Sequence, residues 1–187
     1  MPNWCRNEAI IRSTDYANLK RLLTAAEEGK LLEMLRPFTK ETNYEWDWDW
    51  CVNNWGTKWD IGEVIYAELS PSPTADGVWE LCIDFETAWS PPIAAFMHGA
   101  YRFNHGAYRI NFEFDLYYME DGEGFVGCAK YTKDTGLDDE CYGLYDYGDK
   151  LPSEEEYLDM FPYHIVEHFN MDNLYITLQE IELENNA

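Results

Sequence analysis

The stretch "VWELCIDFE", from Val78 to Glu86, alternates apolar and polar side chains along most of its length. A period of two is typical of a β-strand with one buried and one exposed face. "SPSPTADG" (70–77) precedes it and is rich in turn-forming residues, and "EVIYAEL" (63–69) before that turn has the composition of a second strand. The region therefore predicts an antiparallel hairpin with one buried face.

Upstream of this hairpin, the sequence predicts a strand followed by a helix. "NEAIIRS" (7–13) is short and contains a β-branched pair, which favours a strand. Asp15 can cap the helix that follows, apolar residues recur on one of its faces, and Gly29 is placed to end it.

Downstream, a helix and a further strand are predicted. Ser90 precedes proline and suits an N-cap, which puts Pro91 at the first helical position. "YRINFEFDLYY" (108–118) is the clearest strand in the chain. The order strand, helix, strand, strand, helix, strand is that of a split βαβ sheet. The sequence thus predicts an α+β fold with a ferredoxin-like antiparallel sheet.

The chain is long enough for one large domain, and we predict a single domain over residues 1–187. Its ferredoxin-like core spans 1–119. A tryptophan-rich insertion occupies 37–62, and an acidic extension occupies 120–187.

The extension predicts a mixture of elements. "FVGCAKYT" (125–132) is expected to be a strand, and the acidic, glycine-rich residues 134–149 are expected to form a long loop. Ser153 and Glu156 have the spacing of a helix capping box. "NLYITLQEIEL" (173–183) favours a strand by composition, with a helix as the alternative.

Charge is unevenly distributed along the chain. The formal net charge is −23, and residues 113–187 hold 20 acids against 3 bases. Such a field repels nucleic acid and membrane surfaces and attracts basic protein surfaces, although plain solubility is the competing explanation. The candidate partner-binding residues lie where acids concentrate: Asp134, Asp138, Asp139, Glu140, Asp146 and Asp149. They lack the spacing of a calcium-binding EF-hand loop, so no metal is predicted there.

"EWDWDWCVNNWGTKWD" (45–60) holds five of the eight tryptophans. Three interpretations are open: core that folds back over the sheet or helices, an aromatic groove for a sugar or peptide, or a catalytic site. The candidate ligand-binding residues are Trp55, Lys58, Trp59 and Asp60. Stacked nucleic-acid bases are disfavoured because Lys58 is the sole nearby base to neutralise phosphates. We predict that Trp55 and Trp59 are mostly buried and that Asp60 or Asn54 forms local hydrogen bonds.

The remaining motifs predict no cofactor. The five cysteines are odd in number and lack a Cys-x-x-Cys pair, which indicates free thiols and a cytoplasmic setting. No apolar run approaches the roughly 20 residues of a transmembrane helix. His164 and His168 match the H-x-x-E-H string of some zinc peptidases, but no third ligand is evident, so zinc and catalytic residues are not predicted.

Three unusual motifs occur together: "MPNWC-N" (1–7), "NWGTKWD" (54–60) and "F-T-WSPP" (85–92). Together they resemble the YubB-like family of small proteins carried on bacterial plasmids and phages. This resemblance covers residues 1–119 and implies a ferredoxin-like domain and a mobile-element setting. It implies no reaction.

These observations lead to one functional hypothesis and two alternatives. The leading hypothesis is a non-enzymatic acidic protein of a mobile element that inhibits a basic host protein, such as a nucleic-acid-binding defence or restriction factor, by charge mimicry. It predicts a protein partner, without direct nucleic-acid or membrane binding. The first alternative is an enzyme or a small-ligand or sugar-binding protein whose site lies in "NWGTKWD". The second is a structural or regulatory module whose charge is incidental.

Overall fold

The computed structural model describes residues 3–39, 42, 44–105, 111–148 and 150–185. The first part of the strand predicted at 108–118 and the candidate residue Asp149 lie outside these residues. Within the described ranges, no helix is long and apolar enough to cross a membrane.

Six strands form one sheet in which every neighbouring pair is antiparallel. The spatial order is β2-β3-β1-β4-β5-β6. The strands are β1 (Trp4–Ser13), β2 (Val64–Pro71), β3 (Trp79–Ala88), β4 (Glu113–Glu120), β5 (Phe125–Thr132) and β6 (Gly136–Gly143). The predicted α+β class, antiparallel sheet and β2–β3 hairpin are confirmed.

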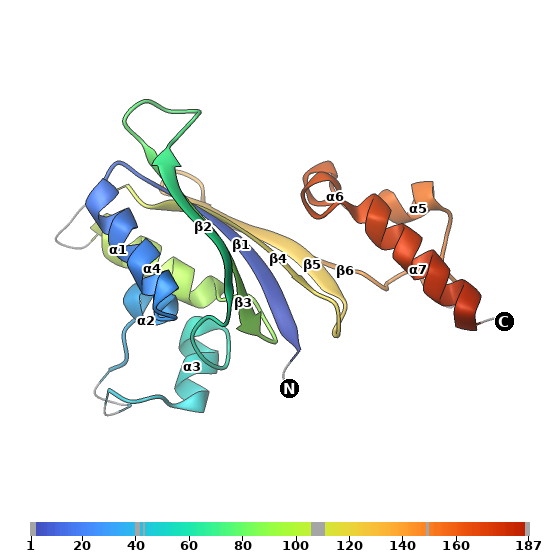
Figure 1. The fold of residues 1–187 in the computed structure, drawn as a ribbon, viewed down its shortest axis with the longest axis horizontal. Helices are drawn as coiled ribbons and strands as arrows, with labels where there is room; N and C mark the ends of the chain where they lie inside the picture. The colour runs from blue at the N-terminus through green and yellow to red at the C-terminus, as the bar shows by residue number, and fades with distance from the viewer. Residues whose placement is uncertain (1–2, 40–41, 43, 106–110, 149, 186–187) are drawn as a thin grey trace.

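Helices α1 and α4 cover one face of the sheet, with α2 and α3 packed beside them (Figure 1). Their bounds are α1 (Tyr16–Glu27), α2 (Leu31–Leu35), α3 (Trp48–Trp55) and α4 (Ile93–His105). The Asp15 carboxylate caps α1 by accepting the backbone N–H of Asn18 at 3.0 Å, as the sequence predicts. Leu19, Leu22 and Ala26 recur at helical spacing and are buried against the sheet, so this face holds the main core.

The C-terminal helices pack on the opposite face of the sheet (Figure 1). They are α5 (Glu154–Leu158), α6 (Tyr163–Phe169) and α7 (Met171–Asn185). Strand β5 is buried on both sides: Ala129 and Tyr131 belong to the main core, whereas Val126 and Cys128 belong to the second cluster beneath these helices. The extension therefore shares the sheet with the core, and the sheet continues across the predicted boundary at residue 119.

The prediction of a long loop over 134–149 is wrong, because Gly136–Gly143 forms the edge strand β6. Gly136, with φ at +76°, follows a tight turn that returns the chain antiparallel to β5. Pairing with β5 satisfies the backbone groups of β6 that face β5, and acidic side chains are tolerated at a sheet edge because they reach solvent.

Two further predictions need correction. Residues 173–183 lie in helix α7 and not in a strand, because Met171 and Tyr175 meet the second cluster at helical spacing. Helix α4 begins at Ile93 and not at Pro91. The carbonyl of Pro92 accepts the first helical bond, from the N–H of Phe96, while the Ser90 hydroxyl is directed to the carbonyl of Gly56.

Candidate functional site

The tryptophan-rich segment forms helix α3 and the loop that follows it. Asp47 caps the helix by accepting the N–H of Trp50 at 2.7 Å, and Gly56 ends it with φ at +86°. Because the segment is helical, some of its tryptophans face the core and others face solvent. Trp50 faces the core, while Trp46 and Trp48 are 56% and 44% exposed.

Trp55 is a core residue, as predicted. It is 1% exposed, and its indole N–H donates to the carbonyl of Arg36 at 2.8 Å. Trp59 is partly buried and packs against Trp4 with ring centroids 6.3 Å apart. The two residues do not share a helical face, because α3 ends at Trp55.

Asp60 connects the loop after α3 to helix α2. Its carboxylate accepts the backbone N–H groups of Leu32 and Glu33, each at 2.9 Å, and of Ile61 at 2.8 Å. Burial raises the pKa of Asp60 to about 6, against the three hydrogen bonds, which lower it. The predicted hydrogen bonding of Asp60 is confirmed, with its partners at the N-terminus of α2. A carboxylate so occupied is poorly placed to act on a substrate.

Lys58 lies between two indole rings. Its ammonium nitrogen is 4.6 Å from the ring centroid of Trp59 and 4.9 Å from that of Trp89. The four predicted ligand-binding residues are therefore not one site: Trp55 is buried in the core and Asp60 binds the start of α2, whereas Lys58 and Trp59 contact the rings of Trp89 and Trp4.

The three sequence motifs meet in space. Thr57 donates to the carbonyl of Ala88 at 2.8 Å, and the Asn7 amide donates to Thr87 at 2.8 Å. The backbone N–H of Trp89 donates to the Asn3 carbonyl at 2.9 Å. Together with the Trp4–Trp59 and Lys58–Trp89 contacts, these bonds form what we call the tryptophan junction: residues 3–7, 54–60 and 85–92. The three unusual motifs therefore have a structural role, because they hold these segments of the fold together.

The predicted acidic residues lie along one edge of the sheet. Asp138, Asp139 and Glu140 are in β6, and Asp134 and Asp146 lie in the turns before and after it. All except Glu140, which is half-buried, are exposed. We call these five residues the acidic edge. Two of them have polar contacts: Asp139 accepts from the Tyr118 hydroxyl at 2.9 Å, and Glu140 lies 3.6 Å from His164.

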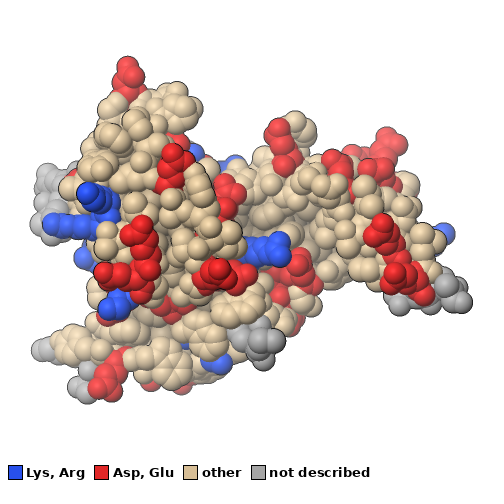
Figure 2. All heavy atoms as spheres, in the orientation of Figure 1, with Lys and Arg blue, Asp and Glu red and all other residues tan. Residues whose placement is uncertain are grey.

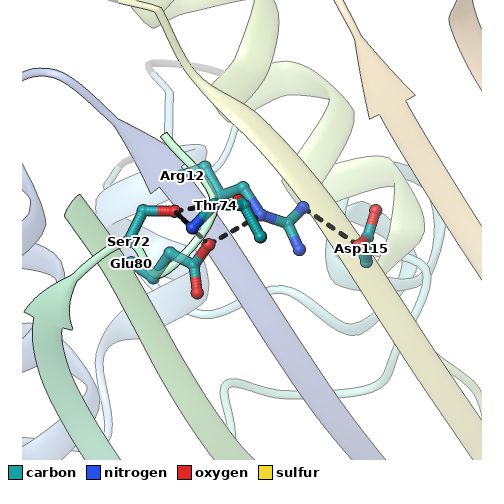
Figure 3. Close-up of polar contacts among 5 residues, drawn as sticks. All are labelled: Arg12, Ser72, Thr74, Glu80 and Asp115. Carbon is teal, nitrogen blue, oxygen red and sulfur yellow. Dashed lines mark hydrogen bonds and ion pairs between the residues drawn. The ribbon is translucent and has the colours of Figure 1, made fainter. Parts of the chain in front are cut away.

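A network on the outer face of the sheet, the face that the C-terminal helices partly cover, shows how a cation neutralises neighbouring carboxylates (Figure 3). Arg12 of β1 lies 3.2 Å from Glu80 of β3 and 2.9 Å from Asp115 of β4. Ser72 adds a hydrogen bond to Glu80 at 2.7 Å. Burial lowers the pKa of Arg12, but the two carboxylates outweigh this effect and raise it, which keeps the guanidinium charged.

A second polar cluster on this face was not predicted. Glu8 of β1 and Asp84 of β3 are direct cross-strand partners. His168 of α6 lies 3.0 Å from Glu8 and stacks on Tyr117, with ring centroids 3.7 Å apart. Burial raises the pKa of both carboxyls and lowers that of His168. The alternation of β1 and β3 put the acids on one face, but the strand register was needed to bring them together.

The histidines of the H-x-x-E-H string thus contact separate acids, Glu140 and Glu8. Among the described residues, no group of three His, Cys, Asp or Glu side chains is placed to hold a metal ion. All five cysteines are free thiols, as predicted. Comparison of the chain with family models, with curated proteins and with solved structures gives no match.

Proposed function

We propose that this protein is a non-enzymatic acidic binding protein that occupies a basic surface of a partner protein in place of nucleic-acid phosphates. The observation that carries this proposal is the acidic edge, where four carboxylates reach solvent. The chain's 13 basic side chains are too few to neutralise its 36 acidic ones. Uncompensated surface charge repels itself, and a basic partner relieves that repulsion.

Strand geometry supports this interpretation. Asp138 and Glu140 lie two residues apart in β6 and share a face, so they are separated by about 7 Å along the strand. This is comparable to the spacing of successive phosphates on one nucleic-acid strand. Acidic side chains also outnumber basic ones over α5–α7 in the view of Figure 2, so the negative surface extends beyond β6.

The proposal also includes a ferredoxin-like core and a mobile-element setting in a bacterial host. The strand order β2-β3-β1-β4, with α1 between β1 and β2 and α4 between β3 and β4, supports a ferredoxin-like core. We propose kinship with the YubB-like family from the three sequence motifs, which contact one another in the fold. In that setting the partner is a host nucleic-acid-binding defence or restriction protein, met in the cytoplasm where the five thiols stay reduced.

The alternative, an enzyme or a small-ligand or sugar-binding protein with its site in "NWGTKWD", has less support. The Trp55 side chain is buried, and both carboxylate oxygens of Asp60 are occupied by backbone donors. Lys58 and Trp59 are half-buried, and their side chains contact other residues of the tryptophan junction.

The test is affinity capture from bacterial lysate across a salt series, followed by association kinetics with the captured protein. The variant Asp138→Asn, Asp139→Asn, Glu140→Gln neutralises three acids of the edge. A matched control neutralises three exposed acids elsewhere: Glu27→Gln, Glu28→Gln and Asp76→Asn. We expect the wild type to capture a basic protein, and the amount captured should fall as the salt concentration rises. Association should be about tenfold slower for the edge variant than for the wild type, and unchanged for the control variant. Absence of salt-dependent capture, or equal binding by both variants, contradicts the proposal.

A further inference from the structure

A small cleft lies where α6 meets the outer face of the sheet. It has a volume of about 170 Å³, and the residues around it include Arg6, Glu8, Ile65, Asp84, His168 and Phe169. Pockets for drug-sized ligands are typically about 300–1,000 Å³. A cleft of this size therefore suits one side chain or a similarly small molecule, and it is too small to enclose a nucleotide.

The chemistry of the cleft favours a cation. Cross-strand partners have β-carbons about 5 Å apart, and like charges placed directly opposite each other destabilise a sheet. Glu8 and Asp84 are such a pair. Four residues further along the same two strands, Arg12 and Glu80 hold the equivalent positions, and there the guanidinium joins carboxylates of β3 and β4 (Figure 3). Arg6 is among the lining residues of the cleft, but among the described residues no guanidinium forms an ion pair with Glu8 or Asp84.

The basic groups beside the cleft do not remove its negative charge. His168 lies 3.0 Å from Glu8, but burial lowers the pKa of His168, which favours the uncharged ring at neutral pH. Arg6 lies two residues before Glu8, about 7 Å along β1. Its direct partner on β3 is Glu86, and among the described residues it forms no ion pair with Glu8 or Asp84.

We propose that this cleft receives the guanidinium group of an arginine side chain supplied by the basic partner, held between Glu8 and Asp84. The inference rests on the proposed function for the source of the arginine. A guanidinium offers parallel donors to carboxylates and stacks on rings, whereas an ammonium is a compact charge that does neither as well. The rings of Phe169 and His168 are among the residues that line the cleft, so a guanidinium bound there would lie beside aromatic surface.

The test uses small probes, so it does not depend on finding a partner. N-acetyl-arginine methylamide is titrated into the full chain while the His168 ring signals are followed by NMR, with the lysine and citrulline amides as comparisons. We expect saturable shifts for the arginine probe in the millimolar range and none for the neutral citrulline probe. Asp84→Asn should weaken binding about tenfold or more, since a charged pair is lost. Glu68→Gln, an exposed acid on the neighbouring strand β2, should leave it unchanged.

The proposal is overturned if the citrulline probe shifts the signals as much as the arginine probe does, or if the lysine probe binds more tightly than the arginine probe. It is also overturned if Glu68→Gln weakens binding of the arginine probe as much as Asp84→Asn does. Asp84→Asn should fold normally because it relieves a like-charge pair, and Glu8→Gln provides a second variant with the same expected loss. The edge variant of residues 138–140 should bind the arginine probe normally. Failure of that variant to lose lysate capture therefore counts against the proposed function alone, whereas failure of the arginine titration counts against the cleft alone.

Discussion

The tryptophan junction and the acidic edge place their carboxylates in opposite ways. At the junction, Asp60 is enclosed and receives three backbone N–H groups within 2.9 Å. At the edge, Asp134, Asp138 and Asp146 are exposed, on or beside a strand that pairs on one side. A carboxylate surrounded by donors serves the fold, while one left in solvent remains available to a partner.

The interactions of the two regions also differ in how far they reach and in how strongly salt weakens them. The junction is stabilised by contacts that depend on packing and on hydrogen-bond geometry, which salt changes little. The edge acts through charge, which is screened over about 8 Å at physiological ionic strength. Substitutions at the junction should therefore change stability, and substitutions at the edge should change association.

The largest effect is expected for Trp55→Ala. The side chain is 1% exposed and packs against Phe38 and Trp50, with ring centroids 4.9 and 5.6 Å away. Truncating a buried large aromatic costs about 3–5 kcal/mol, so the urea midpoint should fall sharply. Trp46→Ala is the control, because Trp46 is 56% exposed and should change stability by about 1 kcal/mol or less. Similar losses in both variants would contradict the division of the segment into core and surface.

A smaller effect is expected for Gly127→Ala, which tests how the acidic edge is attached. A β-carbon at this position would lie 2.3 Å from the carbonyl oxygen of Glu140 and 2.5 Å from the ring of Tyr118. Such overpacking costs about 1–3 kcal/mol. The amides of β6 should exchange hydrogen faster than in the wild type. Lys133→Ala, an exposed position in the β5–β6 turn, is the control, and unchanged exchange in Gly127→Ala would show that β6 can shift without loss.

Asp60→Ala should cost about 2 kcal/mol, since a side-chain acceptor at a helix N-terminus contributes about 0.5–2 kcal/mol and Ile61 supplies a third donor. Chemical denaturation measures the loss. Asp49→Ala, an exposed acid in α3, should have little effect. Equal stability of the two variants would mean that Asp60 does not fix the junction to α2.

The elements with strong local signals were predicted from the sequence. The alternation in β3 and the cap and apolar face of α1 are properties of short stretches, and both elements are confirmed. Strand β6 was missed because its acids and glycines resemble a loop, while its stability depends on pairing with β5. Helix α7 was predicted only as the alternative to a strand, because Tyr175, Ile176 and Thr177 favour a strand locally, whereas packing against the second cluster requires helical spacing.

For the candidate sites too, local features could be predicted from the sequence, whereas features that depend on contacts between distant residues could not. That Trp55 would be buried and that Asp60 would be hydrogen-bonded could be inferred from residue chemistry. The cleft could not be predicted, because Glu8, Asp84 and His168 are far apart in the chain. Only the register of β1 on β3 and the position of α6 bring them together.

The smallest effect concerns His168, which links the extension to β1. Burial lowers its pKa, so the folded protein holds this proton less tightly than the unfolded chain does. The stability that depends on neutral His168 is therefore fully present above the ordinary histidine pKa of about 6.5 and is lost as pH falls below it. The charged and titratable groups around the ring come from five elements: Glu8 of β1, Asp84 of β3, Tyr117 of β4, Lys130 of β5 and His164 of α6.

Urea midpoints of the wild type and of His168→Gln, measured from pH 7.5 to 5.5, check this prediction. The wild type should lose stability on acidification relative to the variant, because the variant has no imidazole to protonate. Asp84 opposes the effect by favouring the protonated ring, while His164 and Lys130 add to it, so the difference should be modest. His105→Gln, an exposed histidine in α4, should instead run parallel to the wild type. If His168→Gln also runs parallel, folding leaves the proton affinity of His168 unchanged, which contradicts the prediction. If the wild type instead gains stability on acidification relative to the variant, the ring is held as a cation by Glu8. The cleft would then carry less negative charge than the arginine proposal requires.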